Sequence, residues 1–128
     1  MIDIENEVFN RVANALRSQF NGISVYGERV ESPSSFPSVS LVEDDNSPAV
    51  GTVSLTADTE KAATLMYTAD IYSAKQSGKK AEAKAIREVI DTEMREMGFA
   101  RTYSNPTPNI DRTIYRFTLR YTRIMQIF

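Results

Sequence analysis

The sequence predicts an α+β fold, a single domain in which two helices pack on one face of a mostly antiparallel sheet. The chain has 128 residues, the size of one typical domain. Apolar residues make up 41% of it and charged residues 25%, which is ordinary for a globular protein. Two segments have helical periodicity and the others alternate between apolar and polar residues. Two amphipathic helices and a set of alternating strands bury their apolar sides most simply when both helices cover one face of the sheet.

Two amphipathic helices are predicted, at residues 3–20 and 77–97. In the first helix, Asp3 can cap the start, and apolar side chains recur at three- and four-residue steps. The second helix has a similar apolar stripe, and Gly98 is a natural residue to end it. Asp91 is predicted on the solvent side of the second helix, where it can pair with Arg87 four residues before it and with Arg95 four residues after it.

Five segments alternate in hydrophobicity and are predicted as strands: 23–27, 38–43, 61–73, 99–103 and 111–127. Prolines and serines make residues 31–37 a loop, and the Asn-Pro-Thr-Pro-Asn sequence of residues 105–109 predicts a turn. Residues 44–60 are predicted as a flexible arm or as a short hairpin at a sheet edge. The whole chain, 1–128, is thus expected to form one domain.

The chain contains neither cysteine nor histidine. Zinc and haem sites use one or both of these residues, and thiol nucleophiles and Ser–His pairs require them. We therefore assign no catalytic residue, no metal ligand and no cofactor, and we expect that the protein is not an enzyme. An enzyme that uses Asp70, Tyr72 or Lys75 is the weakest alternative, because no pair of base and nucleophile is evident.

Charge and hydropathy limit the partners. No apolar run approaches the roughly 18 residues of a membrane-spanning helix. The acidic N-terminal sequence is unlike a signal peptide, so the cytosol is the expected site of the chain. The net charge is −2, and a free nucleic-acid-binding protein usually has a clear basic excess.

The predicted strand 111–127 is the most informative element. Fully extended, this strand would reach about 50 Å. A compact domain of this size has a radius of gyration of only about 14 Å. The strand must therefore bend or project, and a projecting strand is an edge for a neighbouring subunit. The apolar end of this strand offers four interface candidates: Ile124, Met125, Ile127 and Phe128. The alternative is that these side chains dock onto the protein's own core.

Charged residues give further interface candidates. Arg112, Arg116 and Arg120 point the same way on a strand, and no aromatic residue is interleaved on that face. A solvated face, or salt bridges to a neighbour's acids such as Glu43, is therefore favoured over phosphate binding. Asp44 and Asp45 lie in an acidic run that lacks the glycine and closing glutamate of a calcium loop, so a solvated turn is favoured over a cation site. An exposed contact patch is predicted around the start of the second helix, from Lys75, Lys79, Lys80 and Lys84.

In order and texture the chain resembles the tail terminator, or tail-completion, proteins of long-tailed bacteriophages over nearly its whole length. The likeness is carried by the opening amphipathic helix, Val25-Tyr26-Gly27, Phe36-Pro37-Ser38-Val39-Ser40-Leu41, the strand Thr64–Ile71, the helix Lys79–Met97 ending in Gly98-Phe99, and Asn109-Ile110-Asp111-Arg112 before a strand rich in Tyr, Phe and Arg. The resemblance implies a small α/β subunit of a hexameric ring that caps the finished tail tube and offers a surface for the head.

The resemblance also implies the partners: further copies of the chain, the tail tube protein and a head-completion or connector protein. DNA would pass through the ring without specific binding, which agrees with the near-neutral charge. The arginine row is therefore expected to be paired with acids or to face away from the bore. The expected location is the host cytoplasm during assembly and the head–tail neck in the virion. Two alternatives are another neck subunit, such as a stopper or adaptor, and a non-viral module that binds a small ligand or peptide between sheet and helices.

Overall fold

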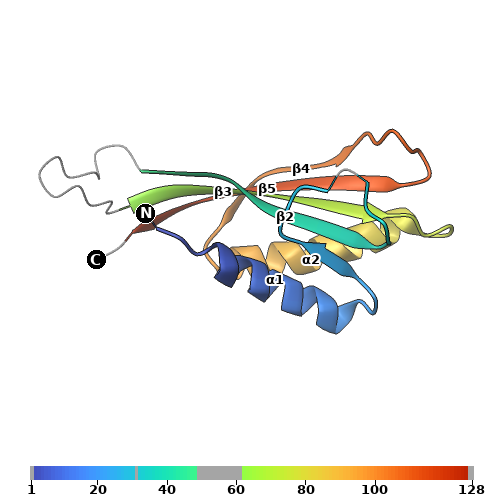
Figure 1. The fold of residues 1–128 in the computed structure, drawn as a ribbon, viewed down its shortest axis with the longest axis horizontal. Helices are drawn as coiled ribbons and strands as arrows, with labels where there is room; N and C mark the ends of the chain where they lie inside the picture. The colour runs from blue at the N-terminus through green and yellow to red at the C-terminus, as the bar shows by residue number, and fades with distance from the viewer. Residues whose placement is uncertain (1, 31, 49–61, 127–128) are drawn as a thin grey trace, which may run out of the picture.

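A computed structural model describes residues 2–30, 32–48 and 62–126 of the chain (Figure 1). The elements in chain order are α1 (Glu5–Gln19), β1 (Ser24–Tyr26), β2 (Ser38–Pro48), β3 (Ala62–Ser73), α2 (Lys79–Glu96), β4 (Ala100–Thr107) and β5 (Tyr115–Gln126). The five strands form one sheet in the order β1-β2-β3-β5-β4. Only β1 and β2 are parallel, and the other neighbours are antiparallel. The predicted α+β class and the single domain are confirmed.

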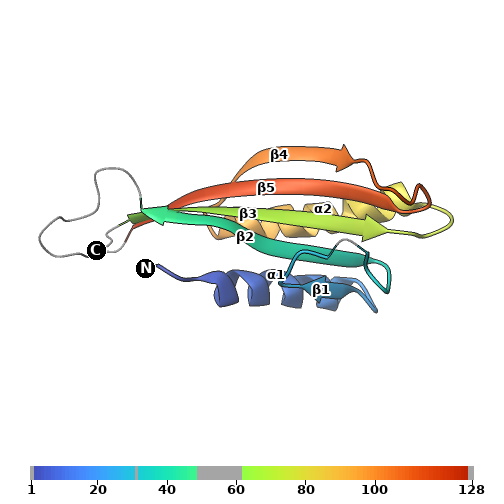
Figure 2. The ribbon, with the colours of Figure 1, turned by 45° about the horizontal axis from the view of Figure 1, so that its top comes forward.

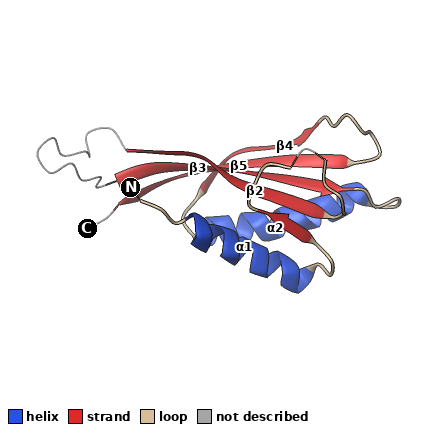
Figure 3. Cartoon of the chain, viewed as in Figure 1, coloured by secondary structure: helices blue, strands red, loops and turns tan. Residues whose placement is uncertain are grey.

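Both helices lie on the same face of the sheet (Figure 3). They lie side by side, and Arg11 of α1 joins them through ion pairs to Glu93 at 2.8 Å and to Glu96 at 2.6 Å. The opposite face, which we call the outer face, has no helix over it in the described residues (Figures 1 and 2). The loop between β1 and β2 reaches over part of this face, because the Tyr72 hydroxyl donates a hydrogen bond to the Val30 carbonyl at 2.9 Å.

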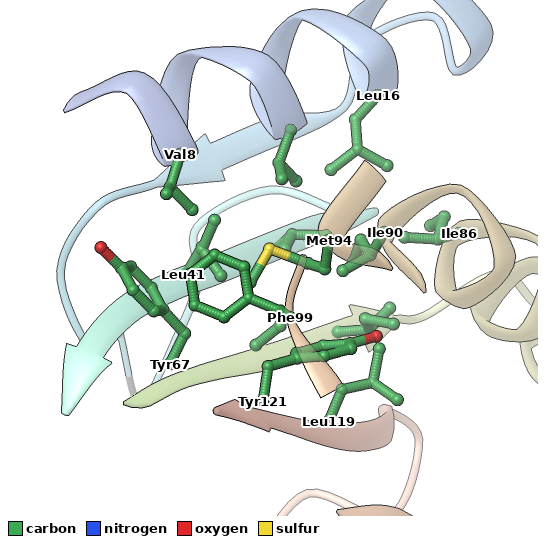
Figure 4. Packing of buried hydrophobic residues seen from close by; sticks show 14 of the residues in the cluster. Val8, Leu16, Leu41, Tyr67, Ile86, Ile90, Met94, Phe99, Leu119 and Tyr121 are labelled. Atoms are coloured by element: carbon green, nitrogen blue, oxygen red, sulfur yellow. The ribbon is translucent and has the colours of Figure 1, made fainter. Parts of the chain in front are cut away.

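The core lies between the helices and the sheet (Figure 4). Every second residue of β3 and β5 points into it, and the helices contribute the side chains of their apolar stripes. Burying one aliphatic side chain of this kind stabilises the fold by about 1.5–3 kcal/mol. The fully buried large side chains are Val8, Val12, Leu16, Val39, Leu65, Tyr67, Ile71, Ile86, Ile90, Met94, Leu119 and Tyr121.

The end of α2 has the predicted form. Gly98 has φ of 88°, a left-handed conformation that favours glycine, and the Phe99 amide donates to the Met94 carbonyl at 3.0 Å. This reversal turns Phe99 back into the core, where its ring meets Tyr67 edge to face at 5.3 Å. The chain then enters β4.

Two strand boundaries near the C-terminal part of the sheet, the start of β5 and the end of β4, differ clearly from the predictions. β5 begins at Tyr115 rather than at residue 111, because the Asp111 carboxylate accepts hydrogen bonds from the Thr113 amide and hydroxyl and closes a turn there. β4 runs on to Thr107, through the predicted turn. It lies at the edge of the sheet, where Pro106 can be accommodated without a lost ladder bond.

The acidic run is also strand rather than turn or arm. β2 continues to Pro48, and its second half pairs with the start of β3, from Asp45 opposite Met66 to Pro48 opposite Ala63. The register shifts between Glu43 and Asp45, which marks a β-bulge at Asp44. The rest of the predicted arm, residues 49–60, lies outside the described residues.

The last strand does not project alone. β5 has 12 residues, about 40 Å when extended, and it pairs with β3 along its whole length, from Ser73 opposite Tyr115 to Ala62 opposite Gln126. Together, β2, β3 and β5 extend past the ends of both helices (Figure 1). We call this three-stranded extension, residues 44–48, 62–66 and 122–126, the projecting end.

Candidate assembly surface

The outer face contains a polar network that the sheet register builds. Asp70 of β3 lies opposite Thr118 of β5 and is 5% exposed, although no helix covers it in the described part of the chain. Its carboxylate accepts hydrogen bonds from the Thr118 hydroxyl at 2.6 Å and from Arg116 Nε at 3.1 Å. The Thr107 hydroxyl of β4 is hydrogen-bonded to Thr118 in turn. These hydrogen bonds and the ion pair with Arg116 compensate for the burial of the Asp70 carboxylate.

The predicted arginine row has two members on the sheet, Arg116 and Arg120. Arg116 forms the ion pair with Asp70, and its guanidinium lies over the Tyr72 ring at 5.5 Å. Arg120 is exposed and lies over the Tyr103 ring at 4.9 Å. Arg112 belongs to the turn before β5 and not to the strand, and its carbonyl accepts a hydrogen bond from Lys79 at 3.3 Å.

The aromatic partners of these arginines come from neighbouring strands. Tyr72 lies on β3 and Tyr103 on β4, so the sequence of β5 alone could not reveal them. A guanidinium over an aromatic ring contributes about 0.5–1 kcal/mol at an exposed site. The arginine row is thus held by one carboxylate and two rings rather than left bare on the sheet.

The acids of β2 point to different sides. Asp44 lies at the bulge, where it accepts a hydrogen bond from the Thr68 hydroxyl and pairs with Arg29 at 3.8 Å. Asp45 is exposed, on the outer face beside Met66. Glu43 faces the helix side, where the Tyr67 hydroxyl donates to it at 3.4 Å. Among the described residues, no group of three or more acids has the arrangement of a metal site.

A hollow of about 410 Å³ opens on the outer face. The network of Asp70 and Thr118 forms its floor, and the side chains around it mix both signs of charge with exposed apolar surface. The residues that line it are Arg29, Asp44, Met66, Thr68, Asp70, Tyr103, Thr107, Arg116, Thr118 and Arg120. This hollow lies on the face opposite the helices, whereas the alternative of a ligand-binding module places its pocket between sheet and helices.

The projecting end contains the apolar interface candidates that the structure describes. Ile124 is 63% exposed and shares the outer face with Arg120, because β5 alternates. Met125 points to the other side and packs against the core. Ile127 and Phe128 lie outside the described residues, so their contacts stay a prediction.

The strand edges at the projecting end are open within the described residues. β1 pairs with β2 only at Ser38–Ser40, and β4 pairs with β5 only as far as Thr122. The exposed stretch of β2 carries features that hinder strand addition, namely its bulge and its acids. A neighbouring subunit would therefore meet this end more through side chains than through new backbone hydrogen bonds.

A buried charged cluster on the helix side was not predicted. Asp91 of α2 is 6% exposed and accepts a hydrogen bond from the Tyr121 hydroxyl at 2.9 Å. It also pairs with Arg101 at 3.1 Å and with Arg95 at 3.8 Å. The predicted solvent-side position of Asp91 is wrong, because β4 and β5 bring Arg101 and Tyr121 over the helix. The cluster fastens α2 to the sheet and is structural.

Taken together, the fold and this surface define a small α+β domain with a polar outer face and a projecting end. No family model matches the sequence, and no curated protein is significantly similar to it. Neither α1 nor α2, the helices of the described residues, combines the length and apolar character needed to cross a membrane.

Proposed function

We propose that this chain is a structural virion protein that forms a ring, hexameric in the family it resembles, which terminates a bacteriophage tail tube and provides the surface that joins the head. The observation that carries the proposal is the projecting end, where three paired strands extend past the helical layer with an exposed Ile124. An extension of this kind adds surface without adding core, and its use is contact with another molecule.

A closed ring needs two different patches on each subunit, because each copy meets its neighbour head to tail. The described part of the chain has two unlike ends. One is the projecting end, and the other is formed by the loops around Gly78 and Asp111 (Figure 1). The outer face supplies further contact surface between them.

The arginines of the outer face support a pore that DNA can traverse. Arg116 is neutralised by Asp70, and Arg120 is held on Tyr103. A bore lined by bare arginines would bind phosphates and retard the DNA. The pairing with Asp70 avoids this cost for Arg116, whereas Arg120 keeps its charge over Tyr103 and is expected to face away from the bore.

Capping of tail tubes is the direct test. Purified chain is added to growing tubes of the tube protein, and tube lengths and ends are recorded by negative-stain electron microscopy. We expect a ring at one end and arrested growth, and the same ring should retain a head connector protein. Binding to the connector alone, with no effect on tubes, would assign the chain to another neck position.

A second candidate function rests on the hollow of the outer face. Its polar floor and exposed Tyr103 and Met66 suit a peptide segment with an acidic side chain that reaches Arg120. This reading predicts a monomer whose melting temperature rises with an acidic peptide. A ring that forms without any ligand would favour the virion protein instead.

A further inference from the structure

One end of the molecule gathers carboxylates. Glu5 begins α1, Asp3 lies just before it and accepts the Glu5 amide hydrogen at 3.1 Å, and Glu43 lies on β2. The Asn46 side-chain amide of β2 donates to the Ile2 carbonyl at 2.6 Å, which holds the start of the chain beside β2. Burial raises the pKa of Glu43, and the charges of Glu5 and Asp3 raise it further, so the three groups repel one another. Within the described residues, no ion pair joins any of them to a basic side chain. We call these three residues the acidic patch.

The opposite end gathers lysines. Lys79, Lys80 and Lys84 lie in the first turns of α2, and Lys75 lies in the loop before it. Lys79 donates to the carbonyl oxygens of Arg112 and Thr113, both at 3.3 Å, which fixes the patch against the turn before β5. None of these four lysines forms an ion pair in the part of the chain that the structure describes. We call them the basic patch.

The basic patch is unfavourable in the isolated chain. The start of a helix carries partial positive charge, and a cation there costs about 0.3–1 kcal/mol. Two acids lie nearby and offset part of this charge: Glu82, which accepts a hydrogen bond from the Ser73 hydroxyl at 2.7 Å, and Asp111, whose pKa is lowered by hydrogen bonds from Thr113 and, less, by the charge of Lys79. The four lysines still outnumber these two acids. Each patch therefore keeps like charges together at some cost to its own subunit, and each has the charge that the other lacks.

The two patches cannot meet within one molecule. The acidic patch lies beside the projecting end, and the basic patch lies at the far end of the long axis, where β3 passes into α2 (Figure 1). Two copies arranged head to tail would bring one of each together. This is the arrangement of a heterologous interface, the kind that closes a ring.

We infer that the basic patch of one copy docks on the acidic patch of the next, and that this contact sets the direction in which the subunits join. The inference rests on the proposed ring. Exposed ion pairs contribute little affinity each, so the charges orient the encounter and exclude the reversed arrangement, and apolar contacts such as that of Ile124 supply most of the affinity.

Charge reversal with mutual rescue tests the contact. The variant Lys80→Glu/Lys84→Glu has two acidic patches, and the variant Glu5→Lys/Glu43→Lys has two basic ones. Each variant alone should assemble only at a protein concentration about tenfold or more above that of the unaltered chain. A 1:1 mixture should assemble at the unaltered concentration into a ring in which the variants alternate, which native mass spectrometry reads as equal numbers of the two masses.

Matched controls place the same charge changes elsewhere. Arg17→Glu lies exposed in the last turn of α1, outside both patches, and Glu28→Lys lies in the exposed loop after β1. Both should assemble like the unaltered chain. Circular dichroism and thermal melting establish that every variant is folded. A salt titration of the unaltered chain is the second measurement, since screening should slow its assembly without any substitution.

The outcomes separate this inference from the proposed function. If both charge-reversed variants assemble at the unaltered concentration, the patches are not the interface, although the ring stands. If Lys80→Glu/Lys84→Glu assembles normally but no longer binds duplex DNA, the lysines contact nucleic acid rather than a neighbouring copy. That result would overturn the inference. If the unaltered chain neither assembles nor caps tubes, the proposed function fails and the inference fails with it.

Discussion

Two tyrosine hydroxyl groups hold carboxylates on the helix side of the sheet, Tyr121 on Asp91 and Tyr67 on Glu43. Sequence alternation predicted the two strands that carry these tyrosines. It could not predict which carboxylates they meet, because Asp91 lies 30 residues from Tyr121 and the contact depends on how α2 sits on the sheet. Burial raises the pKa of both tyrosines, and the adjacent carboxylates raise it further.

Removing one hydroxyl tests this pairing. Tyr121→Phe leaves the buried Asp91 carboxylate with one donor fewer, and we expect the free energy of unfolding to fall by about 1–2 kcal/mol. Urea denaturation at neutral pH measures the change. Tyr103→Phe is the control, since that ring is exposed and should alter stability by less than about 0.5 kcal/mol. Equal stability of the two variants would contradict the pairing.

The same tyrosines predict a loss of stability in alkali. A tyrosine whose folded pKa is raised keeps its proton above pH ~10, where the unfolded chain releases it. The unfolded state then binds fewer protons, so the free energy of unfolding falls as pH rises, by up to about 1.4 kcal/mol per pH unit for each such group. In urea titrations between about pH 10 and 11, the free energy of unfolding of Tyr121→Phe should decline less steeply than that of the unaltered chain. An unchanged slope would show that Tyr121 ionises freely.

At the scale of the elements, the regular parts were predicted well and the edges were not. The helices begin and end within two residues of the predicted positions, because apolar periodicity and the glycine after α2 are local signals. Asp3 does not cap α1, whose N-cap residue is Ile4. Pro106 and the acids of β2 are typical of turns, yet both lie in strands. Pairing with Phe117 and with Met66 outweighs their local preference, and the sequence does not reveal that pairing.

Alternation along β5 gives a prediction about two adjacent residues. Ile124 is exposed on the outer face, and Met125 packs against the core. Ile124→Ser should leave thermal stability within about 0.5 kcal/mol and weaken assembly. Met125→Ser should lower stability by more, because it removes apolar surface from the core. Analytical ultracentrifugation and thermal melting measure the two effects, and normal assembly of Ile124→Ser would remove the projecting end from the interface.

At the scale of the whole molecule, the separation of charge along the long axis is the feature that composition hides. The net charge of −2 gives no sign of it. The lysine patch was predicted as a contact surface from its position on one helix. The acidic patch was not predicted, since it forms only when the fold places the start of α1 beside β2.

Salt should therefore affect association more than folding. Charges on the two patches act over about 10 Å at 0.1 M salt and over about 3 Å at 1 M. We expect the concentration for half-assembly to rise with sodium chloride, and the melting temperature of the single subunit to change little. Light scattering at a series of salt concentrations measures the first, and calorimetry of a dilute sample the second. Assembly that strengthens with salt would point to an apolar interface without charge steering.

The mass of the assembled protein tests the central claim most directly. Native mass spectrometry of the unaltered chain, across a range of concentrations, should give a single closed species built from a fixed number of 14.4 kDa subunits, with six expected from the resemblance. Growth should stop at that number. A 14.4 kDa monomer at every concentration, also in the presence of tail tubes, would contradict the ring and the function proposed from it.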